Sequence, residues 1–413
     1  MGERTLDDLR QKQALPLSVK LKLTMSRIRQ WINEYDEDGV YVSFSGGKDS
    51  SVLLDIVRNK MGYKNVPAVF VDTGLEYPEI REHVKSFDNV VWLKPKMNFR
   101  KVIETYGYPF ISKEVSEKAF YAQRYIKWYL SEHKEESDKI PSPYGIADML
   151  GVHGRKDGRF ELFKAGVIPE EILNDILSAD GKAPGTAKAL WGTYLHKENG
   201  IKTEETSQMF DFSRYRYLAS CPYSISSHCC RIMKKGPVHK YAKDTGRKPM
   251  TAQMAQESRL RTNQWLHNGC NGFNLKSPIS NPMAFWTEQD VLLYIKENNL
   301  PICSVYGDII EDISGTEQVE NQLTFSDLSG FENNKSFDAP SLPLKTTGCS
   351  RTGCMFCGYG CHLDKPGEGR FERMKETHPK QYEWIMKPWD EGGLGYKDVI
   401  DWLNEHGNLN IRY

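Results

Sequence analysis

The segment from Ser45 to Ser50, Ser-Gly-Gly-Lys-Asp-Ser, is suited to binding phosphate. Its two glycines let backbone N–H groups approach an anion closely. A helix that begins after the segment would add the positive end of its dipole. Lys48 supplies a positive charge and Asp49 a contact for Mg²⁺, although the spacing is not that of a Walker A loop. We therefore expect a phosphate-binding site formed by Ser43, Phe44, Ser45, Gly46, Gly47, Lys48, Asp49, Ser50 and Ser51.

A second polar segment follows an apolar run, Val66–Val71, which reads as a buried strand. The residues Asp72, Thr73 and Gly74 come directly after it. In open α/β sheets, ligands bind beyond the carboxyl ends of the strands, so these three residues are candidate nucleotide contacts. The alternative is an ordinary turn capped by the carboxylate of Asp72.

The nine cysteines are unevenly distributed along the chain. Four of them fall within thirteen residues: Cys349, Cys354, Cys357 and Cys361. Upstream lie Cys221, Cys229, Cys230 and Cys270, and Cys303 stands alone. A Cys-x-x-Cys pair with a distant cysteine pair can form a four-thiolate site for zinc or for an iron–sulfur cluster. A purely local set that includes Cys349 and Cys361, a ligand role for Cys270, and buried thiols without metal are the alternatives.

The elements around the phosphate segment alternate between strand and helix. The patterns predict a helix over Leu17–Glu34, strands over Gly39–Phe44, Val66–Val71 and Val90–Leu93, a helix over Ser51–Lys60, and a helix over Trp286–Asn298 capped by Thr287. Strand, helix and strand joined by short connections imply an α/β fold with a parallel twisted sheet and flanking helices.

The domain organisation follows from where this pattern weakens. We expect a helical lead over residues 1–38, a nucleotide-binding α/β domain over 39–119 and 219–305, and a helical insertion over 120–218. Residues 306–413 would hold a loop or flap over Ile309–Ser341, a cysteine knuckle over Gly348–His362 and a helical tail over Phe371–Tyr413.

Composition excludes several classes of protein. Lys plus Arg and Asp plus Glu both number 55, so net charge does not drive non-specific binding to nucleic acid or membrane. Apolar residues make up 39% of the chain, enough for a core. The apolar runs are far shorter than the roughly 20 residues that span a membrane. With an N-terminus too charged for a secretory signal, we expect a cytoplasmic protein without membrane contact, whose thiols stay reduced.

The Ser45–Ser50 segment resembles the signature of the PP-loop ATP pyrophosphatases, which split ATP between the α and β phosphates. The Asp72-Thr73-Gly74 stretch resembles that of the phosphoadenylyl-sulfate (PAPS) reductase branch of the same superfamily. Further matches follow in the same order: Cys229-Cys230 with a basic stretch, Glu-Ser-x-x-Arg ending at Arg261, a Trp-Thr-x-x-Asp-Val helix, and Cys354-x-x-Cys357. The resemblance runs from about Val40 to Leu363, without the insertion.

The resemblance implies a fold, ligands and roles. The fold would be that of the Rossmann-like adenine nucleotide α-hydrolases. The cofactors would be ATP, Mg²⁺ and a [4Fe–4S] cluster on Cys229, Cys230, Cys354 and Cys357, with zinc as the alternative metal. Lys48 and Asp49 would be catalytic, and Arg259 and Arg261 would face an anionic substrate or the released pyrophosphate. The alternative for the basic residues is a solvated charged face.

Two departures from the reductases favour ATP use over sulfate reduction. Reductases characteristically degrade the phosphate loop, whereas Ser45–Ser50 is intact here. They also use a nucleophilic cysteine in a C-terminal tail, and no cysteine follows Cys361 in this sequence.

We therefore expect an enzyme that cleaves ATP to AMP and pyrophosphate to activate an acceptor for sulfur transfer. The acceptor could be a nucleic acid, as in thiolation or phosphorothioation, and a sulfur-donor protein such as a cysteine desulfurase could be a partner. The alternatives are a sulfonucleotide reductase that releases sulfite and a nucleotide-binding regulatory module.

Overall fold

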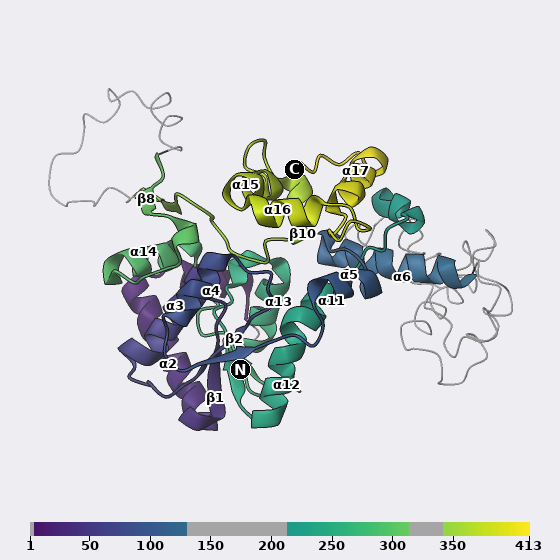
Figure 1. Cartoon of the computed structure of the whole chain (residues 1–413). Helices are drawn as coiled ribbons and strands as arrows, with labels where there is room; N and C mark the ends of the chain where they lie inside the picture. The colour runs from purple at the N-terminus through teal and green to yellow at the C-terminus, as the bar shows by residue number, and fades with distance from the viewer. Residues whose placement is uncertain (1–3, 130–212, 314–341) are drawn as a thin grey trace, which may run out of the picture. The chain divides into compact units, whose positions relative to one another are not determined.

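The computed structural model describes residues 4–129, 213–313 and 342–413 (Figure 1). The chain forms two compact units. The first consists of Met1–Pro95 and Gly236–Cys354, and the second of Lys96–Lys235 and Met355–Tyr413. Within the described ranges, no helix is both long and apolar enough to cross a lipid bilayer.

A six-stranded sheet organises the first unit, in the order β3-β2-β1-β5-β7-β6. The strands are β1 (Val40–Ser43), β2 (Ala68–Val71), β3 (Val90–Leu93), β5 (Lys248–Met250), β6 (Asn271–Gly272) and β7 (Ile279–Ser280). All neighbouring strands run parallel except β6 and β7. Val42 of β1 lies opposite Ala68 on one side and Met250 on the other, so β1 is central. The predicted α/β fold with a mostly parallel sheet is confirmed.

Seven α-helices belong to the described part of this unit. They are α1 (Leu6–Gln13), α2 (Leu17–Tyr35), α3 (Lys48–Asp55), α4 (Pro78–Lys85), α12 (Gly236–Thr245), α13 (Arg259–Asn268) and α14 (Glu288–Asn298). One apolar core joins all of these helices except α12 to the sheet and includes the buried Val42, Phe70 and Trp286. In the same unit, Lys20 of α2 forms a buried ion pair with Asp290 of α14, with Nζ 2.6 Å from Oδ2.

Most predicted elements of this unit are present, with small shifts of their ends. The predicted helix over Leu17–Glu34 and the predicted strand over Val90–Leu93 are confirmed. The helix predicted to begin at Ser51 begins instead at Lys48, because the extended Gly47 is its N-cap. Its continuation over Ile56–Lys60 is π-helical.

The prediction of a loop or flap over Ile309–Ser341 is wrong at its start. There β8 (Ile309–Glu311) pairs antiparallel with β9 (Leu344–Thr346). Residues 314–341 lie outside the described residues.

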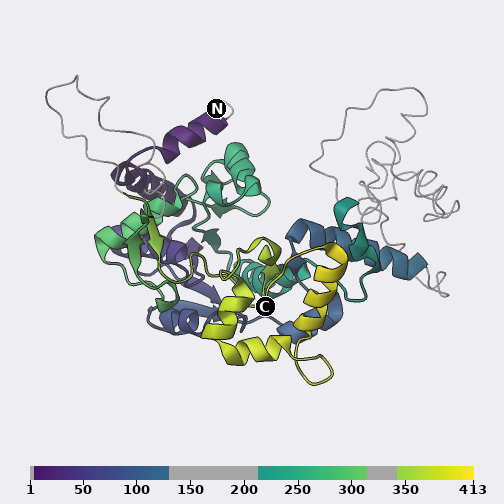
Figure 2. The same ribbon diagram turned by 90° about the horizontal axis from the view of Figure 1, so that it is seen from above.

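The second unit is mainly helical. Its elements are α5 (Phe99–Tyr106), β4 (Phe110–Ile111), α6 (Lys113–Tyr129), η5 (Ser213–Ser220), α11 (His228–Cys230), η6 (Arg231–Lys235), β10 (Gly358–Tyr359), η11 (Cys361–Leu363), α15 (Arg370–Thr377), α16 (Pro379–Met386) and α17 (Tyr396–Gly407). The helices α15 and α16 pack on each other, and α16 packs on α17 (Figure 2). Of the predicted helical insertion over 120–218, residues 130–212 lie outside the described residues.

Candidate active site

The Ser45–Ser50 segment, called the phosphate loop from here on, follows the central strand β1 and leads directly into α3. Gly46 has a φ of +71°, a backbone conformation that side-chain-bearing residues rarely adopt. A Cβ atom at Gly46 would lie 2.6 Å from a methyl group of Val84 and 2.9 Å from one of Ile80. Only glycine therefore allows this loop to pack closely on α4.

Hydrogen bonds within the loop hold its shape without a ligand. The Ser50 hydroxyl donates to the carbonyl of Gly47 at 2.9 Å, and the backbone N–H of Ser45 donates to Ser50 Oγ at 3.2 Å. The N–H of Gly47 donates to the hydroxyl of Ser45 at 3.3 Å. The loop is therefore preorganised at the N-terminus of α3, where an anion is favoured.

Lys48 is 2% exposed, and protein groups surround its ammonium. Its Nζ donates to the carbonyl of Ser350 at 2.9 Å. The same nitrogen lies 3.2 Å from a carboxylate oxygen of Glu288 and 3.6 Å from one of Asp49. A phosphate oxygen would compete with these three oxygens for the ammonium. Sequence reasoning missed Glu288 and Ser350, because both lie far along the chain from the loop.

Tyr306 is a further residue at the loop that the sequence did not indicate. Its phenol oxygen accepts a hydrogen bond from the backbone N–H of Lys48 at 3.0 Å and lies 2.6 Å from Thr352 Oγ1. Burial raises the pKa of Tyr306 to about 12, so the phenol stays protonated at neutral pH. Its hydroxyl and that of Thr352 share a hydrogen bond in which either group can be the donor.

Asp49 lies in the first turn of α3 beside Lys48. Its buried Oδ1 atom lies 3.6 Å from the Lys48 ammonium and has no closer hydrogen-bond donor among the described residues. Burial raises the pKa of Asp49, while the positive charges of Lys48 and Arg351 oppose that shift. A carboxylate beside a phosphate-binding loop suits Mg²⁺, which binds through one or two carboxylates together with substrate phosphates.

Arginines from two distant segments flank the loop. Arg261 of α13 forms an ion pair with Glu257, and Arg351 binds the other carboxylate oxygen of Glu257. Burial and the charge of Arg351 lower the pKa of Arg261, whereas Asp49 raises it. The predicted residue Arg261 is thus brought within electrostatic reach of Asp49, together with Arg351, which the sequence analysis did not select. Arg259, also predicted, is exposed at the first position of α13.

The remaining predicted nucleotide residues lie at the ends of β1 and β2. The buried Phe44 is a core residue whose ring lies 5.0 Å from that of Phe87. Ser43 ends β1, and Ser51 Oγ lies 3.5 Å from His83 Nε2.

The turn after β2 is fastened by contacts within the first unit. The carboxylate of Asp72 is 8% exposed and accepts a hydrogen bond from Arg81 at 2.9 Å. Thr73 Oγ1 donates to Glu76 at 2.8 Å, and Gly74 has a φ of +74°. The Asp72 carboxylate therefore binds a side chain rather than capping the turn, which Thr73 and Glu76 hold instead. The segment directly follows β2, at the carboxyl end where the nucleotide contacts are predicted.

The four predicted metal ligands divide between the two units. Cys354 is the last residue of the first unit, whereas Cys229, Cys230 and Cys357 belong to the second. Within the second unit, burial raises the pKa of Tyr359, and the charges of these three cysteines add to the shift. Burial and Cys230 also raise the pKa of Cys357, against Arg370 and Lys234.

These thiols are not arranged as a finished metal site. Over the described ranges, no three Cys, His, Asp or Glu side chains are grouped so that they could hold a metal ion. The other candidates have protein contacts: the Cys361 thiol donates to the carbonyl of Gly358 at 2.8 Å, and Cys349 Sγ lies 3.9 Å from the phenol oxygen of Tyr77. Cys270 is buried in the core of the first unit. We therefore assign no step of the reaction to a metal cluster.

Comparison with known proteins assigns the chain to a protein family. Residues 39–125 and 193–358, more than half of the chain, match the phosphoadenosine phosphosulfate reductase domain. Two uncharacterized proteins of Methanocaldococcus jannaschii match locally. MJ0066 is 37% identical over 75 residues, which are 17% of this chain and 15% of that protein. MJ0973 is 41% identical over 75 residues, which are 17% of this chain and 18% of that protein. The chain belongs to the phosphoadenosine phosphosulfate reductase domain family, whose members are enzymes that act on nucleotides.

Proposed function

We propose that the protein is an ATP pyrophosphatase that cleaves ATP to AMP and pyrophosphate to activate an acceptor for sulfur transfer. The observation that carries the proposal is the preorganised loop at the N-terminus of α3, with Lys48 and Asp49 in the first helical turn. Arg261 and Arg351 add positive charge at the same end of the sheet.

In this proposal the phosphates of ATP lie on the loop amides and hydroxyls, including Ser45 and Ser51. Lys48 exchanges Glu288 and Ser350 for phosphate oxygens and stabilises the negative charge of the leaving pyrophosphate. Mg²⁺, held by Asp49 and the phosphates, would neutralise charge as the bond breaks. Arg261, Arg351 and Arg259 are positioned to hold the anionic product or substrate.

The reaction has two balanced steps. An acceptor oxygen attacks the α-phosphorus, the bond to the bridging oxygen of pyrophosphate breaks, and the adenylated acceptor forms. A sulfur nucleophile then displaces AMP from that acceptor, so sulfur replaces the activated oxygen. We propose a nucleic acid as the acceptor, a sulfur-donor protein such as a cysteine desulfurase as the partner, and the reducing cytoplasm as the location.

Substitution at the loop tests this proposal. We expect Lys48→Ala and Asp49→Ala each to lower AMP formation from α-labelled ATP about 100-fold or more, because each removes charge stabilisation at the phosphates. Lys60→Ala, an exposed change near the end of the same helical segment, is the control and should leave the rate unchanged. Circular dichroism checks that all variants fold. Folded loop variants with undiminished AMP formation would refute the proposal.

A [4Fe–4S] cluster, with zinc as the alternative, is also proposed on Cys229, Cys230, Cys354 and Cys357. The family resemblance supports it, and Cys229, Cys230 and Cys357 all act electrostatically on Tyr359. Iron, sulfide and zinc analysis of anaerobically purified protein provides the test. We expect Cys357→Ser to lose bound metal and Cys303→Ser, a buried thiol of the first unit, to retain it. Wild-type protein without iron, sulfide or zinc would refute both metals.

Sulfonucleotide reduction is the second candidate, and the family match favours it. It predicts sulfite release from adenylyl sulfate in the presence of a thiol donor. Tight ATP binding without AMP formation, with every acceptor offered, would instead support a regulatory module.

A further inference from the structure

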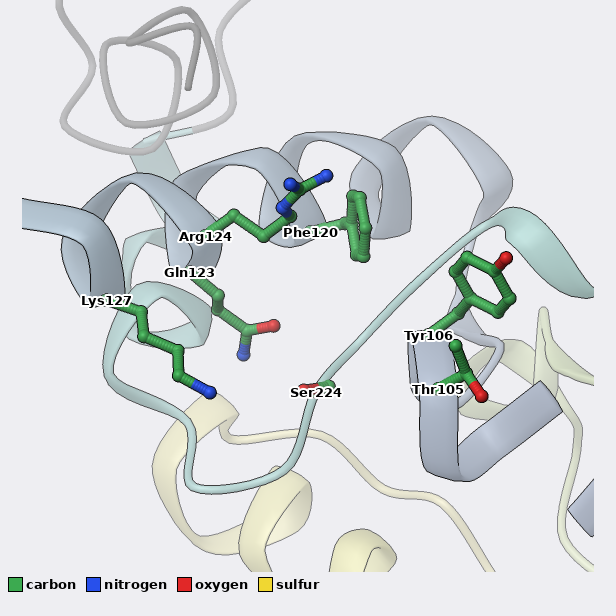
Figure 3. A pocket seen from close by; sticks show the side chains of 7 residues that line it. All are labelled: Thr105, Tyr106, Phe120, Gln123, Arg124, Lys127 and Ser224. Carbon is green, nitrogen blue, oxygen red and sulfur yellow. The ribbon is translucent and has the colours of Figure 1, made fainter. Parts of the chain in front are cut away.

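A pocket of about 430 Å³ in the second unit lies outside the phosphate loop. It is bounded by the end of α5, one face of α6 and the segment that contains Ser224. Figure 3 shows Phe120, Gln123, Arg124 and Lys127 projecting from α6, with Tyr106 on α5 across from them. Its volume is in the range of small-ligand sites.

The pocket is positively charged. Arg124 and Lys127 are exposed at the pocket, and none of the described residues that line it is acidic. The guanidinium of Arg124 lies 5.4 Å from the centre of the buried Phe120 ring, so Phe120 supports this cation. Together with the partly exposed Tyr106, the two basic residues suit a ligand that carries both a negative charge and a flat ring.

The aromatic side chains of the pocket pack against one histidine, His228. The ring of Tyr106 stacks on that of His228 with centroids 5.0 Å apart and planes 7° apart. Phe120 packs on the same histidine at 4.4 Å. His228 thus fixes both rings and is followed directly by Cys229 and Cys230.

The opposite wall is also fixed. The Gln123 amide nitrogen donates to the carbonyls of Leu218 and Tyr223, both at 3.0 Å, and its oxygen accepts from the N–H of Ile225 at 3.0 Å. Since Gln123 fastens the segment around Ser224, the walls are in place before a ligand enters. Thr105 and Ser224 are exposed at the margin, which leaves the pocket open to a ligand that continues beyond it.

We propose that this pocket binds one nucleotide unit of a single-stranded nucleic acid. Its base would lie against the partly exposed ring of Tyr106, and its phosphate would contact Arg124 and Lys127. Such a combination of aromatic surface and basic residues is typical of single-strand binding. The inference rests on the proposed function in that it gives the proposed nucleic-acid acceptor a binding site.

The experiment measures binding of fluorescein-labelled 20-mers of DNA and RNA to the full chain by fluorescence anisotropy, without ATP or Mg²⁺. The double variant Arg124→Gln/Lys127→Gln should weaken binding at least about tenfold. It should also reduce the slope of log affinity against log salt by about 0.7, because the contact with one phosphate of the strand is lost. Tyr106→Leu should weaken binding about tenfold through lost stacking. Lys113→Gln, which removes an exposed charge from the same helix outside the pocket, is the matched control.

Equal strand affinity of the double variant and the Lys113→Gln control would overturn the proposal. Displacement of the 20-mer by AMP at a similar concentration would also overturn it, because the pocket would then take a free nucleotide. Comparison of the DNA and RNA arms identifies the kind of strand. Since binding needs no ATP turnover, a wild-type protein that forms AMP but does not bind the strand refutes only this inference. Intact binding without AMP formation refutes only the proposed function.

Discussion

At the scale of single residues, the protein oxygens around the Lys48 ammonium would compete with a bound phosphate for it. Glu288 lies 3.2 Å from its ammonium and is 41% exposed. We expect Glu288→Gln to tighten ATP binding about threefold, since a partly exposed ion pair of up to about 1 kcal/mol no longer competes. Isothermal titration calorimetry would measure the change against Glu297→Gln, an exposed carboxylate of the same helix. Unchanged or weaker binding would show that Glu288 does not compete with the nucleotide.

His83, beside Ser51, links stability to pH. Burial lowers the pKa of His83 below its ordinary 6.5, so the unfolded chain binds the proton more readily than the folded one. Stability should therefore fall as the pH drops below 6.5. We expect His83→Gln to reduce the loss in urea midpoint between about pH 7.5 and about pH 5.5. The exposed His239→Gln serves as control, and equal losses in both variants would contradict this assignment.

The sequence analysis identified those candidate site residues that belong to continuous sequence motifs. Lys48, Asp49 and Arg261 were selected, and the structure brings all three into one charged environment. Tyr306 and Arg351 were not selected, because only folding brings them to the loop from positions about 250 and 300 residues away in sequence. No local pattern distinguishes them from ordinary surface or core residues.

At the scale of elements, the buried ion pair between α2 and α14 is a point where one substitution should be costly. Lys20 and Asp290 are almost fully buried, with side chains 3% and 10% exposed. Lys20→Met should lower the free energy of unfolding by about 3–5 kcal/mol, because it leaves the Asp290 charge buried without its partner. Urea unfolding measures this loss, and Lys22→Met, at an exposed position of α2, should cost far less. Equal stability of the two variants would contradict the role of the pair.

The elements were predictable where local patterns determine them. The capping box of Thr287 and Asp290 in α14 is present, with the Thr287 hydroxyl accepting from the Asp290 N–H at 3.3 Å. The start of α3 was misplaced because Lys48, Asp49 and Ser50 are polar and carry no apolar periodicity. The pairing of β8 with β9 was missed because it joins segments more than 30 residues apart. Strand order likewise depends on long-range pairing.

At the scale of the whole molecule, the chain assigns different chemistry to its two units. The first unit contains the phosphate loop with its lysine, aspartate and arginines, and the second contains Cys229, Cys230 and Cys357. The second unit also contains the aromatic and basic pocket (Figure 3). In the proposed reaction, the first unit activates the acceptor with ATP and the second binds it.

The products of ATP cleavage are the most direct test of the proposed pyrophosphatase activity. Anaerobically purified protein would be given Mg²⁺, α-labelled ATP and single-stranded oligonucleotides, and the nucleotide and phosphate products separated and quantified. We predict that AMP and pyrophosphate form in equal amounts. Formation of ADP and phosphate would contradict it, because the loop would then cleave at the γ-phosphate.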